Sequence, residues 1–101
     1  MPYFDVIPEG VRRELDAHAA TGDEDVSSFV EAVLRNDLRR AVCLASDEEL
    51  AAIRPIVHYV HNELPGLCWG SEERVRAWRA HHRASLIAQR AVETGGQEKQ
   101  P

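Results

Sequence analysis

Two histidines with helical spacing are the first candidates for chemistry in this sequence. His58 and His61 lie three residues apart, so on a helix they share one face and could bind a metal ion together. Cys68, His81 and His82 could supply further ligands. A zinc site normally needs a spaced ligand set with orienting partners, and no Cys-x-x-Cys or His-Glu-x-x-His motif occurs. We therefore interpret the pair as surface or core-flanking histidines and predict no metal and no cofactor.

Cys68, with a histidine nearby in the sequence, is a candidate nucleophile. Nucleophilic catalysis needs a base within hydrogen-bond reach, an orienting group and an oxyanion site, and the spacing offers no complete set. Cys68 precedes Trp69 in an apolar loop, as is typical of a small core residue that packs beside an indole. The sequence therefore predicts a protein that is not an enzyme.

A row of arginines near the C-terminal end is the third candidate. Arg76, Arg79, Arg83 and Arg90 follow one another at intervals of 3, 4 and 7, which places them on one side of a helix. Such a face could bind nucleic-acid phosphates or an acidic partner. It could also be a solvated face, or pair with acidic residues of the same molecule or of a second copy. Aromatic residues do not interleave with it, since Trp78 falls on the inner stripe.

The charge of the chain is unevenly distributed. The formal net charge is −5; residues 1–70 hold 13 acidic and 6 basic side chains, whereas residues 71–92 hold 2 acidic and 5 basic ones. This balance disfavours a chain that simply coats nucleic acid or an anionic membrane. Two cysteines make no disulfide framework, and neither a signal peptide nor a membrane-spanning run is visible. We expect a cytoplasmic protein.

The apolar residues recur at helical spacing, without the alternation typical of strands. This pattern predicts an all-α fold: a compact bundle of about four helices, with an extended N-terminal lead and a disordered C-terminal tail. We expect a single helical domain over residues 1–94. A flexible tail over residues 95–101 is expected because Gly95-Gly96 should end the last helix.

Start and stop signals delimit the first two helices. The first helix begins after Pro8 and ends at Gly22. The second begins with a capping box, Ser28–Glu31. It either continues to Ala45 or breaks near Asn36-Asp37, because both of these residues are poor in helix interiors.

The last two helices are delimited in the same way. A second capping box, Ser46–Glu49, opens the third helix. Pro55 removes a backbone hydrogen bond there, but the apolar register does not slip, which predicts one kinked helix rather than two. Pro65-Gly66 ends this helix, and Ser71 caps the fourth.

Several residues in and around the last loop are interpreted as structural anchors: Pro65, Cys68, Trp69 and Trp78. The core of a four-helix domain does not explain Tyr3 and Phe4 so easily. These two aromatic residues could cover an open groove or dock onto another subunit.

Two stretches of the chain resemble a family of small proteins met in phage and prophage genomes. The first is Phe29–Leu38 with the following Ala41 and Ala45-Ser46-Asp47, and the second is Ile56–Trp78, whose turn reads N-E-x-P-x-x-C-W-G-S. The resemblance covers most of residues 7–82 and implies context rather than mechanism, because no activity is established for that family. His61 stands where the family would have tyrosine, which weakens a shared metal role. The arginine-rich continuation past His82 lies outside the resemblance.

These observations predict a non-enzymatic interaction protein that binds a host or phage protein, with inhibition of a host protein as one form of that action. The alternative is a nucleic-acid-associated module that uses the arginine face. We expect the partner-binding residues to be Arg76, Arg79, Arg83, Arg90, Tyr3 and Phe4. A symmetric homodimer in which acidic and basic patches meet is a further alternative, and no membrane partner is expected.

Overall fold

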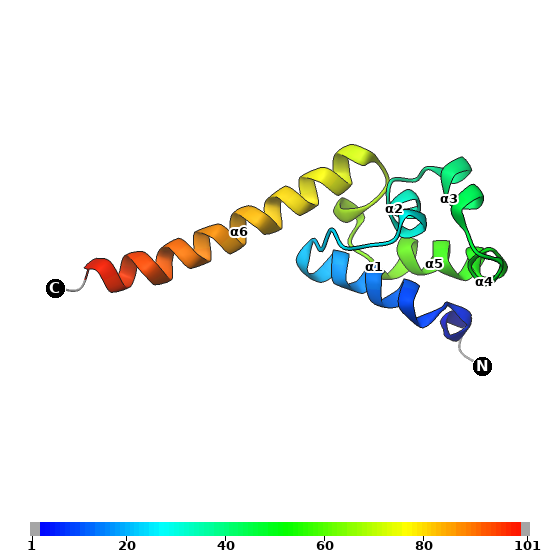
Figure 1. The fold of residues 1–101 in the computed structure, drawn as a ribbon, viewed down its shortest axis with the longest axis horizontal. Coiled ribbons are helices and arrows are strands. Elements are labelled where there is room, and N and C mark those ends of the chain that lie inside the picture. Colours follow the sequence, from blue (N-terminus) through cyan, green and yellow to red (C-terminus); the bar gives the residue numbers. More distant parts are fainter. Residues whose placement is uncertain (1–2, 100–101) are drawn as a thin grey trace.

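The last helix projects from a body of short helices in the computed structural model of this protein (Figure 1). The structure describes the backbone of residues 3–99 and the side chains of residues 3–89. The elements are η1 (Tyr3–Val6), α1 (Glu9–Thr21), α2 (Ser28–Leu34), α3 (Leu38–Leu44), α4 (Asp47–Ala51), α5 (Ile53–Glu63), η2 (Gly66–Cys68) and α6 (Glu72–Lys99), where η marks a 3-10 helix. The prediction of an all-α fold is confirmed. The prediction of about four helices was too low, because two of them are interrupted.

The first interruption separates α2 from α3 at Asn36. This residue has φ 61°, a left-handed conformation that asparagine tolerates better than most residues. Asp37 then caps α3, because its carboxylate accepts a hydrogen bond from the Arg40 N–H at 3.2 Å. Of the two alternatives for this segment, the break near Asn36-Asp37 is therefore correct.

The second interruption separates α4 from α5 at Ala52, which has φ −104° and ψ 12°. Pro55 is the third residue of α5, in the first turn, where no intrahelical partner awaits its missing N–H. Ending α4 before this point avoids the steric clash that a proline causes inside a helix. The prediction of a single kinked helix was therefore wrong.

The helix caps lie where the sequence predicts them, except that the cap of α2 lies one residue earlier. Ser46 and Glu49 form the predicted capping box, with N···O distances of 2.8 and 3.1 Å. At α2 the cap is Ser27 rather than Ser28, and its hydroxyl accepts from the Val30 N–H at 3.2 Å. With the cap at Ser27, the third helical residue is Val30 rather than Glu31, so the predicted capping box does not form.

The N-terminal lead forms a 3-10 turn over Tyr3–Val6 rather than an extended segment, which corrects the prediction for this part of the chain. Phe4 packs edge-on against Tyr59 of α5, with ring centroids 5.2 Å apart. Tyr3 lies 5.5 Å from His58 by the same measure. These aromatic contacts hold η1 against α5, while Met1 and Pro2 lie outside the described residues.

The core lies between α1, α2, α5 and the start of α6. Its largest fully buried side chains are Leu15, His18, Val30, Leu34, Ile56, Val60, Cys68 and Val75. Trp69 and Trp78 are half-buried and pack against this core. Burial of such side chains supplies most of the free energy of folding, at about 25 cal/mol per Å² of apolar surface.

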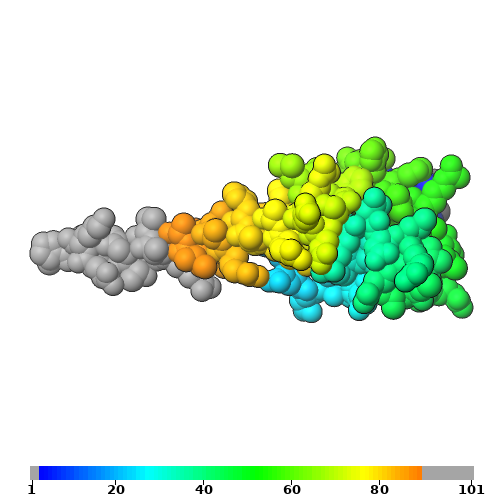
Figure 2. All heavy atoms as spheres, turned by 90° about the horizontal axis from the view of Figure 1, so that it is seen from above, coloured from blue at the N-terminus to red at the C-terminus, as the bar shows by residue number. Residues whose placement is uncertain are grey.

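One side of the first three turns of α6 packs against the core, and the rest of the helix projects away from it. The spacing of apolar residues predicts an inner stripe that runs on to Leu86, with Ile87 beside it. In the structure this stripe ends at His82, because every residue from Arg83 to Gln89 is exposed. The molecule is consequently elongated, with extents of 60 × 29 × 20 Å, and Figure 2 shows α6 narrowing away from the broad body. The backbone of α6 continues past Gly95-Gly96, where the sequence predicted a helix end; a flexible tail over residues 95–101 stays a prediction. Within the described residues, no helix combines the length and apolarity needed to cross a membrane.

Candidate functional site

A buried histidine joins the last helix to the body. His18 lies on the apolar face of α1 and is fully buried. Its Nε2 atom donates a hydrogen bond to the Cys68 carbonyl at 2.8 Å, and the Trp78 indole N–H donates to the His18 carbonyl at 2.9 Å. We call these three residues the His18 junction. It connects α1, η2 and α6 through these two hydrogen bonds.

The imidazole of His18 is neutral at neutral pH. Burial lowers its pKa, and the nearby Arg79 cation lowers it further, although the bond to the Cys68 carbonyl acts in the opposite direction. Because Nε2 is the donor, Nδ1 carries the lone pair, and that atom has no hydrogen-bond partner in the described part of the chain. Protonating His18 would therefore place a charge in the core, away from the water that would solvate it.

The Cys68 thiol is not poised for chemistry. The residue is fully buried, and burial raises the pKa of its thiol to about 11, so the reactive thiolate is scarce at neutral pH. The junction uses its backbone carbonyl rather than its sulfur. The neighbouring imidazole of His18 donates to the Cys68 carbonyl, so it is not arranged as a base for the thiol. Pro65 is exposed between α5 and η2.

The histidines proposed as a metal-binding pair contact aromatic rings. His58 faces Tyr3, and the His61 ring centroid lies 5.9 Å from that of Trp69 in an edge-on arrangement. Further along, His82 packs against Trp78 at 4.9 Å, and His81 is exposed. Nowhere in the described residues do three histidine, cysteine, aspartate or glutamate side chains gather as metal ligands would.

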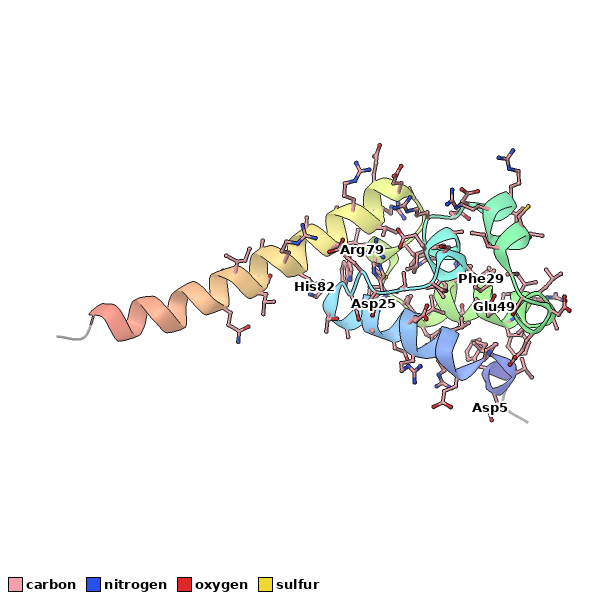
Figure 3. The ribbon with its side chains drawn as sticks, viewed as in Figure 1. Asp5, Asp25, Phe29, Glu49, Arg79 and His82 are labelled. Atoms are coloured by element: carbon pink, nitrogen blue, oxygen red, sulfur yellow. The ribbon has the colours of Figure 1, made fainter. Side chains whose placement is uncertain are left out.

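Three of the four predicted arginines face glutamates of the same molecule. Arg79 donates two hydrogen bonds to the Glu31 carboxylate, at 3.0 and 2.6 Å, across the interface between α6 and α2. Arg83 pairs with Glu24 at 2.5 Å. Arg76 pairs with Glu72 on its own helix at 3.2 Å. The side chain of the fourth, Arg90, lies outside the described side chains. Figure 3 shows Arg79 and His82 together on the side of α6 that faces the body.

These contacts belong to a longer chain of ion pairs. Glu31 also accepts from Arg35 at 2.7 Å, and Arg35 reaches Glu72 at 3.4 Å. The hydrogen bonds from Arg79 lower the pKa of Glu31, although partial burial opposes this effect. Spacing alone placed the arginines on one face, but it could not reveal the glutamates, because Glu31 and Arg79 are 48 positions apart in the sequence.

The arginine face is thus largely neutralised. The pairs combine four cations, Arg35, Arg76, Arg79 and Arg83, with three anions, Glu24, Glu31 and Glu72, which leaves a single excess positive charge. A hollow of about 230 Å³ lies between these side chains. A small anion could contact its rim, but a nucleic-acid backbone would have to displace several carboxylates.

The reactive groups singled out in the sequence are therefore engaged in packing and pairing, and the body around them carries most of the acidic residues. Comparisons of this chain with models of protein families, with curated proteins and with solved structures found no match.

Proposed function

We propose that this chain is a small non-enzymatic interaction protein of the phage or mobile-element type, which binds a host or phage protein in the host cytoplasm. The observation that carries the proposal is the pairing of Arg76, Arg79 and Arg83 with glutamates of the same molecule. Cations that are already paired contribute little to phosphate binding, because a new anion must compete with the carboxylate. The acidic body is then the dominant electrostatic feature available to a partner.

The environment of the candidate reactive groups also supports binding rather than catalysis. Cys68 is buried and protonated, and His58 and His61 are packed against aromatic rings. Tyr3 and Phe4 are used to hold η1 against α5, with Phe4 half-buried and Tyr3 exposed. Tyr3 therefore remains available to a partner, whereas Phe4 mainly serves the fold.

The charge of the body indicates the chemistry of the partner. With 13 acidic and 6 basic side chains, residues 1–70 create a negative field that attracts basic protein surfaces and accelerates their association. Proteins that bind nucleic acid carry such surfaces. An acidic chain that occupies one of them blocks its normal use, and inhibition of a host protein would follow; this step is argued by analogy.

The test is a pull-down from host lysate with the tagged full chain, run with and without nuclease. A discrete protein band that persists after nuclease treatment and forms a stoichiometric complex is the expected result. The proposal fails if binding disappears with nuclease.

A charge-reversed variant sharpens this test. Arg76→Glu with Arg83→Glu changes two exposed arginines of the arginine face and leaves the more buried Arg79 in place. Arg39→Glu with Arg54→Glu is the matched control, since it makes the same change in charge at exposed sites on α3 and α5. Loss of binding in the α6 variant alone, together with a steep dependence on salt, would establish the nucleic-acid module instead.

A further inference from the structure

We draw no further inference here: the strongest candidate, the apolar groove of about 180 Å³ between α3 and α5, carries none, because nothing in the described part of the structure shows what covers it.

Discussion

Replacing Arg79 by glutamine should destabilise the fold far more than replacing an exposed arginine of α6. The side chains of Arg79 and Glu31 are 11% and 19% exposed, so their two hydrogen bonds lie in a partly desolvated interface. Breaking a buried ion pair from one side costs about 3–5 kcal/mol. Glu31 keeps Arg35 as a second partner, which lowers our expectation to about 2–3 kcal/mol. For a domain of this size the melting temperature should fall by roughly 10–20 °C, measured by circular dichroism.

Arg83→Gln is the matched control, because it removes another arginine one turn further along the same helix. Its pair with Glu24 is 60% and 59% exposed, and such pairs contribute less than about 1 kcal/mol. Acid should also reduce the difference between wild type and Arg79→Gln. The pKa of Glu31 is lowered in the folded state, so its contribution is present above the unfolded value of about 4.3 and is lost as the pH falls through the folded value. Equal, small losses in the two variants would refute the reasoning.

Three further predictions concern buried or constrained groups. The pKa of His18 is lowered in the folded protein, so its imidazole binds a proton at a higher pH in the unfolded chain than in the folded one. The free energy of unfolding should therefore fall as the pH drops below about 6.5. Urea titrations of His18→Gln should show a weaker dependence of this free energy on pH. A thiol reagent should label the exposed Cys43 in the native protein and reach the buried Cys68 only after unfolding; rapid labelling of both would contradict the structure. Gly22→Ala should cost more than about 1 kcal/mol, since φ is +68° and the added carbon would lie 3.0 Å from an α6 side chain. Gly66→Ala, with open space around it, should be nearly neutral in the same thermal melts.

The sequence predicted helix ends best where a local chemical signal marks them. The capping box at Ser46–Glu49 and the glycine at Gly22 act through neighbouring backbone groups, so their residue types suffice to locate them. The interruption at Ala52 was missed because a one-residue break hardly changes the spacing of apolar side chains. Pro55 indicated an irregularity in the helix, but the break itself lies three residues earlier, at Ala52 between α4 and α5.

The sequence predicted which residues of the candidate site share a helix face, but not which residues they contact. Spacing placed Arg79 and Arg83 on one side of a helix, whereas the burial of His18 is known only from the structure. Their partners lie 48, 59 and 50 positions away in the sequence, and such pairs depend on how the helices pack. Net charge showed that the body is acidic, but not that Glu31 takes up two arginines.

The His18 junction has a consequence for how this chain folds as it is synthesised. Its two hydrogen bonds join residues 50 and 60 positions apart, and closing such distant contacts is slower than forming local helices. Translation delivers α1 first, so its apolar face and His18 stay open to water until Cys68 and Trp78 have left the ribosome. A chain that ends before Trp78 therefore lacks one of the two hydrogen bonds of the His18 junction.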